Sequence, residues 1–301
     1  MSSTISYPMS TKTHTRFIIG LIFYVFFSSA WALAQTPKQQ AGQLKLIALS
    51  PHLVELLYEL GAQEHIIATT TSSDYPDDAR HILTVGDHSR LQIEKIIQLQ
   101  PDIILAWKSG NPLDDLSRLE SYGLRVEYFD PKVLSDVAAD IRRLGELVEK
   151  SPLAEILANQ FLQRLTQITS RYSKRQAVSV FFEIWPSPLQ TVSGGSWPQQ
   201  QLQACGADNI IQNSTEDYPS ISIEQVLTNQ PQVIIQPRSE RAPASAIFDW
   251  TTYPFIPAVK HHFILHPNAD KMYRMTRRVL DEIDSLCQSI DQARQFYLSS
   301  K

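Results

Sequence analysis

The chain has 301 residues, of which 43% are hydrophobic, so it is long and apolar enough to bury two modest cores. Its formal net charge of −4 argues against the basic surface on which nucleic-acid-binding proteins depend, and we expect no nucleic-acid partner. Composition otherwise describes an ordinary globular protein, so its function has to be sought in motifs and their spacing.

The first 34 residues have the pattern of a secretory signal peptide. Lys12 and Arg16 give a mildly basic start, residues 17–27 form an apolar run, and residues 32–34 read Ala-Leu-Ala, a small-x-small cleavage pattern. The alternative is a membrane anchor, but the run is short for a span of about 20 residues. The pattern therefore predicts cleavage and export from the cytoplasm.

Only two cysteines are present, Cys205 and Cys287. In an oxidising compartment outside the cytoplasm, an even count favours one disulfide. Two unpaired buried thiols are the alternative. Because no cysteine stands at the cleavage site, the sequence gives no signal for a lipid anchor.

Short apolar runs alternate with helical patterns in the first half of the remaining chain. Strands are predicted over residues 45–49, 66–68, 103–105 and 125–129. Helices are predicted over residues 54–60 and 113–121, and from residue 93 to the proline at 101. Strands that alternate with helices indicate a mainly parallel sheet covered on both faces.

A strongly helical region follows, over about residues 135–173. Ser151 and Pro152 suit an N-cap and a first helical position, and an apolar stripe at helical spacing runs from Leu153 to Tyr172. Residues 151–173 contain no glycine. We therefore expect one long, stiff helix that joins two lobes and lets them move little.

The second half repeats the same kinds of element. A strand is predicted over residues 177–182, a loop over 185–197, a helix over 199–204, a strand over 263–265 and a closing helix over 272–290. Residues 205–207 (Cys-Gly-Ala) echo residues 60–62 (Leu-Gly-Ala). These parallels indicate that the two halves are related.

One helix–strand unit occurs twice, as IEKIIQLQPDIILAW (93–107) and IEQVLTNQPQVIIQP (223–237). In each copy a glutamate, Glu94 or Glu224, stands in the first helical turn, where the helix dipole favours negative charge. A proline then stops the helix, and a β-branched run suits a buried strand. The duplication predicts an α/β fold of two similar lobes, residues 35–134 and 176–301, joined by the helical region 135–175.

The sequence carries no convincing catalytic constellation. We find no Gly-x-Ser-x-Gly, His-Glu-x-x-His or Cys-x-x-Cys motif, no phosphate-binding glycine loop and no dense histidine cluster. We therefore predict no catalytic residue, no resident metal and no cofactor. Aromatic and polar residues remain in loops at strand ends, where open α/β sheets bind ligands; they are Tyr75, His88, Trp107, Trp185, Trp197 and Tyr218. The alternative is that each packs on its own lobe.

Several motifs resemble those of periplasmic cobalamin-binding proteins that serve ABC importers. They are residues 73–76 (Ser-Asp-Tyr-Pro), residues 106–111 (Ala-Trp-Lys-Ser-Gly-Asn), residues 205–210 (Cys-Gly-Ala-Asp-Asn-Ile) and both repeat units. More widely, the chain resembles binding proteins with a helical backbone that serve cobalamin, haem, siderophore and metal uptake. The resemblance covers nearly all of residues 44–295. It implies two α/β lobes, each a mainly parallel sheet covered by helices, joined by one long rigid helix, with the ligand in the cleft between them.

The same resemblance implies a function and partners. The protein would be a monomer without enzymatic activity that captures cobalamin, a transported ligand and not a cofactor, in the periplasm. It would deliver the ligand to an ABC transporter permease dimer in the inner membrane. By resemblance, Tyr75 and Trp107 match aromatic residues of the cleft, while Asp270 and Arg274 match polar contacts from the second lobe.

Two positions depart from the family pattern, because His88 and Tyr218 stand where the family has tryptophans of the cleft. Both residues are smaller and more polar than tryptophan. The sequence therefore does not determine which corrinoid is bound. A histidine that faces a metal-centred macrocycle can donate a hydrogen bond or act as an axial ligand. His52 is a second candidate for the cleft, or a residue of a helix start.

The resemblance also assigns roles outside the cleft. Glu94 and Glu224 match two acidic residues, one in each lobe, that dock onto arginines of the permease. Cys205 and Cys287 match a disulfide-bonded pair. Both assignments concern residues that the repeat or the cysteine count had already singled out.

The sequence also allows three rival functions. A haem- or siderophore-binding protein would share the fold, although siderophore pockets usually gather several Arg or Lys residues and these loops contain few. A secreted hydrolase would need a nucleophile–base pair or a metal site. A structural envelope protein would leave the loop aromatics unexplained.

Overall fold

The computed structural model describes residues 43–239 and 247–300, together with Ser3, Thr4 and Ser6. By its internal contacts the chain divides into Met1–Gln43 and Leu44–Lys301, and both four-stranded sheets lie in the second unit. The predicted signal peptide falls almost wholly outside the described residues. Among those that are described, no helix has both the length and the apolar character needed to cross a membrane.

The first sheet contains four parallel strands in the order β2-β1-β3-β4. Its strands are β1 (Leu46–Ala48), β2 (Ile66–Thr69), β3 (Ile103–Trp107) and β4 (Val126–Phe129). The connections contain α2 (Pro51–Glu59), η1 (Gln63–His65), η2 (Asp77–His81), α3 (Ile93–Leu99) and α4 (Leu113–Ser121). The first helix begins three residues before its predicted start, because a proline is tolerated in the first turn.

The second sheet has the order β10-β9-β5-β8 and is also parallel. Its strands are β5 (Val178–Phe182), β8 (Ala207–Asn209), β9 (Val233–Ile235) and β10 (Ile264–Leu265). Read from its other edge, the second sheet has the order β8-β5-β9-β10, and the first has the order β2-β1-β3-β4. In both sheets the second strand along the chain lies at the edge and is followed by the first, third and fourth. The predicted fold class is therefore confirmed, with two sheets of the same topology.

The other elements of the second half surround this sheet. They are β6 (Trp185–Pro186) and β7 (Leu189–Gln190), α7 (Trp197–Ala204), α8 (Ile223–Asn229), η4 (Trp250–Thr252), α9 (Pro257–Lys260), α10 (Ala269–Tyr273) and α11 (Val279–Ser299). The prediction of a single closing helix over residues 272–290 is wrong, because two helices occupy this part of the chain. The backbone of Arg274 is extended, which ends α10 before α11 begins.

The repeated unit has the same backbone in both copies. Helices α3 and α8 each contain seven residues, and each ends at a glutamine in the left-handed conformation, Gln100 with φ 48° and Gln230 with φ 46°. The strands that follow, β3 and β9, are both internal strands of their sheets. The duplication read from the sequence thus extends to helix length, helix ending and strand position.

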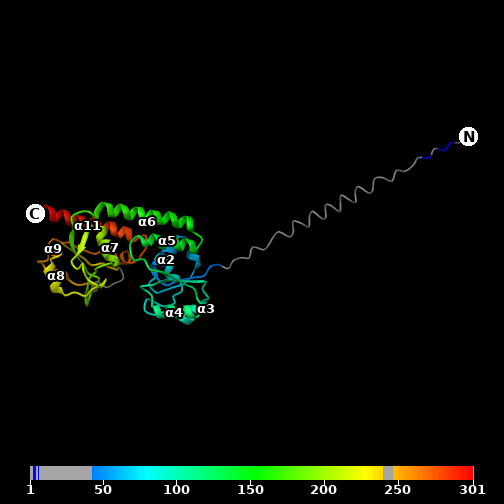
Figure 1. The fold of residues 1–301 in the computed structure, drawn as a ribbon, viewed down its shortest axis with the longest axis horizontal. Helices are drawn as coiled ribbons and strands as arrows, with labels where there is room; N and C mark the ends of the chain where they lie inside the picture. The colour runs from blue at the N-terminus through cyan, green and yellow to red at the C-terminus, as the bar shows by residue number, and fades with distance from the viewer. Residues whose placement is uncertain (1–2, 5, 7–42, 240–246, 301) are drawn as a thin grey trace. The chain divides into compact units, whose positions relative to one another are not determined.

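The two sheets share one hydrophobic core with the central helices. These are α5 (Asp136–Leu147) and α6 (Ser151–Tyr172), and Figure 1 shows α6 beside both α5 and α11. Strand residues alternate between cores, since Leu46 and Ala48 face the shared core whereas Ile47 faces a separate core under α3 and α4. Contacts group Leu44–Lys301 as one compact unit, so the predicted lobe boundaries stay a prediction.

The predicted disulfide is present. Cys205 at the end of α7 and Cys287 in α11 are bonded, with an S–S distance of 1.98 Å and a Cα–Cα distance of 4.7 Å. Both cysteines are buried, and the alternative of two free thiols is wrong. The bond fixes the closing helix to the helix that precedes β8.

Replacement of both cysteines by alanine should lower the free energy of unfolding by about 2–5 kcal/mol, because the unfolded chain gains freedom. Urea unfolding of parent and double variant measures this loss. Thiol titration of the unreduced, unfolded parent provides the control, and two reactive thiols per chain would contradict the assignment.

Candidate functional site

The carboxyl ends of parallel strands meet at one edge of a sheet, and ligands of open α/β folds bind there. In the first lobe this edge carries residues 49–52, 70–76 and 107–111, which follow β1, β2 and β3. In the second lobe it carries residues 183–185, 236–239 and 266–270, which follow β5, β9 and β10. Tyr75, Trp107 and Asp270 therefore lie at the edges where a site is expected.

Trp107 is the last residue of β3, and a tight turn fixes its position. Its backbone N–H donates to Asn111 Oδ1 at 2.7 Å, and Asn111 Nδ2 donates to the carbonyl oxygen of Leu49 at 2.8 Å. A Cβ added to Gly110 would lie 1.9 Å from the indole ring, so only glycine fits beneath it. The indole Nε1 is buried and has no hydrogen-bond partner among the described residues.

His52 supports this tryptophan and is not open to solvent, because only 3% of its surface is exposed. Its ring meets that of Trp107 edge-on, with 5.5 Å between the centroids, and its Nδ1 lies 3.1 Å from Ser50 Oγ. Burial, followed by the positive charge of Arg274, lowers the pKa of His52 from 6.5 to about 3. The imidazole is therefore neutral and belongs to the packing under the site.

A buried carboxylate joins the first lobe to the connection between α10 and α11. Glu55 of α2, whose side chain is 1% exposed, accepts hydrogen bonds from Arg274 Nη1 at 2.7 Å and from Arg278 Nε and Nη2 at 2.9 and 2.6 Å. Arg274 Nη2 also donates to Asp74 Oδ1 at 2.7 Å and lies 3.8 Å from Asp270. Buried charges persist only when they are paired, and here each guanidinium is paired.

The same cluster reaches Tyr75, which is 45% exposed. The guanidinium carbon of Arg278 lies 3.6 Å from the centroid of the tyrosine ring, a cation–π contact. Arg278 thus links Tyr75 to Glu55, and Glu55 links it to Arg274. Of the residues predicted to contact ligand, Tyr75, Arg274 and Asp270 are brought together, whereas Trp107 contacts His52 outside this cluster.

The second lobe contributes aromatic residues of two kinds. Tyr218 and Trp185 are 44% and 59% exposed, whereas Trp197 is buried and donates from Nε1 to the carbonyl oxygen of Met272 at 2.9 Å. Trp197 therefore packs on its own lobe, as the alternative interpretation had it. Partial burial, and then the charge of Asp217, raises the pKa of Tyr218, so its phenol stays protonated at neutral pH.

Glu183, directly after β5, is a buried carboxylate that sequence reasoning missed. It accepts hydrogen bonds from Trp250 Nε1 at 2.7 Å, Gln236 Nε2 at 2.9 Å and the backbone N–H of Phe248 at 3.0 Å. These bonds tie the chain after residue 247 to the end of the sheet. Its position at a strand end was the signal that could have found it.

Glu55, Asp74 and Arg278 were also missed. Asp74 belongs to the quoted motif 73–76, and Arg278 follows Arg274 by four residues. Glu55 is the one charged residue within the apolar sequence Leu-Val-Glu-Leu-Leu of residues 53–57, all of which are buried. A charge on an apolar helix face signals a partner, although the sequence does not name it.

His88 stands apart from this cluster. It is exposed in the turn of residues 87–90, where Asp87 Oδ1 accepts hydrogen bonds from the backbone N–H groups of Ser89 and Arg90. Within the described part of the chain, no hydrogen bond or ring contact joins His88 to Tyr75. Its role toward a ligand stays a prediction.

Glu94 and Glu224 are exposed in the first turns of α3 and α8. Around Glu224 a capping box is formed, in which Ser222 and Gln225 satisfy each other's backbone N–H groups. Hydrogen bonds from its own backbone N–H and from Ser222 lower the pKa of Glu224. Both carboxylates are thus exposed surface groups at matching steps of the repeat.

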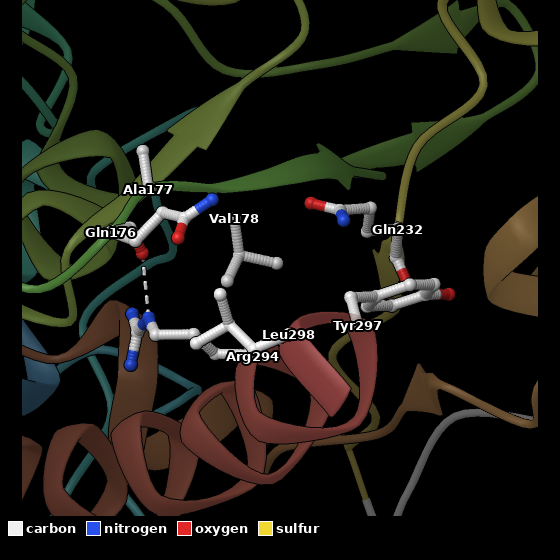
Figure 2. A pocket seen from close by; sticks show the side chains of 7 residues that line it. All are labelled: Gln176, Ala177, Val178, Gln232, Arg294, Tyr297 and Leu298. Carbon is white, nitrogen blue, oxygen red and sulfur yellow. Dashed lines mark hydrogen bonds between the residues drawn. The ribbon is translucent and has the colours of Figure 1, made fainter. Parts of the chain in front are cut away.

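Two cavities lie beside the second sheet, outside the cluster around Tyr75. One of about 20 Å³ is lined by Gln176, Val178 and Tyr297, beside Arg294, whose Nε donates to the carbonyl oxygen of Gln176 (Figure 2). The other, of about 480 Å³, is lined mainly by amide side chains such as Asn229. Neither contains a predicted site residue. No cluster of three or more metal-ligating side chains occurs among residues 43–239 and 247–300.

The space under Trp107 provides a test of how the site is built. Gly110→Ala should lower the free energy of unfolding by about 1–3 kcal/mol, because the new Cβ forces the indole to move. Gly195→Ala is the matched control, since a Cβ there meets nothing within 4 Å. Urea unfolding compares the two variants, and equal stabilities would show that the indole is not held against Gly110.

The buried imidazole predicts a pH dependence of stability. The folded-state pKa of His52, about 3, lies below its ordinary 6.5, so the unfolded chain binds the proton first and stability falls as pH falls between these values. Between pH 7 and pH 5 this residue should account for a loss of about 2 kcal/mol. His52→Gln should remove that part of the loss in urea unfolding at the two pH values. Equal losses in parent and variant would contradict the buried neutral state.

Comparison with known proteins places this geometry in a family. The model of the family described as "Periplasmic binding protein" matches residues 46–272. The chain is 32% identical to the vitamin B12-binding protein of Vibrio campbellii over 271 residues, 90% of this chain and 96% of that protein. It is 34% identical to the vitamin B12-binding protein of Vibrio cholerae over 81% of this chain and 87% of that protein.

Solved structures agree with this placement. The periplasmic vitamin B12-binding protein BtuF of Vibrio cholerae superimposes with a TM-score of 0.76 at 33% identity, covering 83% of this chain and 97% of that structure. The periplasmic haem-binding protein HutB of Vibrio cholerae, at 19% identity with a TM-score of 0.72 over 82% of this chain and 99% of that structure, shares the fold. On the family match and these relatives, the chain belongs to the periplasmic binding protein family, a class of binding proteins and not of enzymes.

Proposed function

We propose that this protein captures cobalamin in the periplasm and delivers it to the permease of an ABC importer. The observation that carries the proposal is the identity of 30–34% to vitamin B12-binding proteins over 81–92% of the chain. Relatives that share only the fold include haem-binding proteins, at 18–20% identity. The ligand of the more similar relatives is therefore the better guide.

The proposed site lies between the carboxyl-end edges of the two sheets. Exposed aromatic side chains are available from both lobes, with Tyr75 from the first and Tyr218 and Trp185 from the second. A corrin macrocycle presents a broad apolar face bordered by amide groups, which suits aromatic contact combined with polar groups. Arg274 and Asp270, paired with each other at 3.8 Å, are the polar residues proposed to meet those amides.

The two departures from the family pattern adjust this site. His88 and Tyr218 replace tryptophans with smaller rings that can donate hydrogen bonds. We propose that His88 forms a hydrogen bond with the ligand and does not coordinate its metal. Either role requires that the exposed loop of residues 87–90 reaches the ligand.

Delivery requires a surface that the permease can recognise. We propose that Glu94 and Glu224 present one carboxylate from each lobe to a permease made of two equal subunits. Both lie exposed at the same step of a duplicated unit, and arginine–carboxylate pairs fix orientation as well as adding affinity. The alternative is that each glutamate only stabilises its own helix. Common descent of the two lobes would then explain why the same residue stands at the same step of both repeats.

Isothermal titration of the protein without residues 1–34 tests the ligand. Cyanocobalamin should bind at one site per chain, because one pair of strand-end edges faces one macrocycle. Haemin, titrated in parallel, is the control for any flat macrocycle. Binding of haemin without binding of cyanocobalamin would move the proposal to haem transport, and binding of neither would reject a macrocycle as ligand.

Charge reversal tests the docking role. Glu94→Arg and Glu224→Arg should leave cyanocobalamin affinity and melting temperature nearly unchanged, since both residues are exposed, while each abolishes uptake. Uptake is measured in vesicles that contain the cognate importer. Glu146→Arg, the same change at an exposed residue of α5, is the matched control. Normal transport by both reversed variants would reduce these residues to helix-start acids.

A further inference from the structure

Three arginines within five residues, Arg274, Arg277 and Arg278, lie in the connection between α10 and α11. A free guanidinium at the edge of a ligand site is the group best suited to capture a carboxylate, because it can donate two parallel hydrogen bonds. The pairing of these arginines therefore bears directly on the charge of the ligand that the site accepts.

Two of the three are held by one buried carboxylate. Glu55 accepts one hydrogen bond from Arg274 and two from Arg278, and its side chain is 1% exposed. Arg274 has a second carboxylate partner in Asp74 at 2.7 Å and a third, Asp270, at 3.8 Å. The guanidinium groups of Arg274 and Arg278 are thus each hydrogen-bonded to a carboxylate of the protein before any ligand binds.

The other face of this arrangement is Tyr75. Arg278 directs its hydrogen bonds to Glu55 while its flat face lies on the ring of Tyr75, 3.6 Å from the centroid. The Nε and Nη2 donors of this guanidinium are consequently engaged, and one of its faces is covered. A carboxylate of a ligand would have to displace Glu55 to reach these donors, whereas an amide needs no charged partner.

We infer that Glu55 is a specificity-determining residue, which neutralises Arg274 and Arg278 so that the site selects a neutral, amide-bearing macrocycle over one that carries carboxylates. The inference rests on the proposed function, because it presumes that a macrocycle binds beside Tyr75 and Arg274. Selection of this kind works by weakening the binding of the wrong ligand. A ligand carboxylate would approach the carboxylates Glu55, Asp74 and Asp270, while the arginines that could attract it are already paired with them.

Helix α2 supplies a matched control one turn further on. Glu59 is also paired with an arginine of this connection, since Arg277 Nη1 lies 3.4 Å from its Oε2. Its side chain is 25% exposed, and Arg277 also donates to Gln160 at 3.1 Å. Glu59→Gln therefore removes an equivalent charge from the same helix without uncovering Arg274 or Arg278.

The test compares two probes that differ in one group. These are cyanocobalamin and its monocarboxylates, in which one peripheral propionamide is hydrolysed, each separated isomer being titrated by calorimetry. The parent should prefer the amide form by about tenfold, and Glu55→Gln should reduce that preference at least about threefold for one or more isomers. Glu59→Gln should keep the preference of the parent. A merely structural role would weaken both probes alike and leave the ratio unchanged.

The outcomes separate the inference from the proposed function. An unchanged ratio in a folded Glu55→Gln variant that binds cyanocobalamin overturns the inference alone. If that variant does not fold or binds neither probe, Asp74→Asn, which removes the other close carboxylate of Arg274, is measured in its place, and an unchanged ratio there overturns the inference. A parent that binds neither probe contradicts the proposed function itself.

Discussion

The two lobes depend on one hydrophobic core that the central helices share with both sheets. Leu105 of the first sheet, Phe161 of α6 and Val180 of the second sheet belong to the same buried cluster. Each Å² of apolar surface kept from water contributes about 25 cal/mol, so any movement that separates a sheet from α6 is opposed on both sides of the helix. A stiff connection follows, in contrast to a linker that lets two lobes close freely.

The charged cluster lies at the same junction and fixes the positions of the side chains around Tyr75. Removal of one partner from a buried ion pair leaves an uncompensated charge, which costs far more than the pair itself contributes. Glu55, Arg274 and Arg278 therefore hold one another in place, and Arg278 in turn holds the ring of Tyr75. Within the proposed function, the ligand meets groups that are already ordered before it binds.

Periodicity and duplication in the sequence predicted the fold well, because helix and strand patterns are local. The break between α10 and α11 was not predictable, since residues 272–290 keep a helical pattern and the extended Arg274 pairs with Glu55, 219 positions away. Strand β8 was missed because its three residues include an exposed aspartate. The resemblance named Tyr75 and Arg274, but their shared partner Glu55 depends on tertiary contact, which no local pattern records.

The central claim is that one macrocycle binds at the carboxyl-end edges, beside Tyr75 and the Glu55 cluster. The most direct measurement is a crystal structure with cyanocobalamin, with X-ray data collected at the cobalt absorption edge. Our account predicts a single anomalous peak per chain between the two lobes, with the corrin in contact with Tyr75 and Tyr218. A cobalt peak at the 480 Å³ cavity near Asn229, or at any place remote from Tyr75, would contradict it.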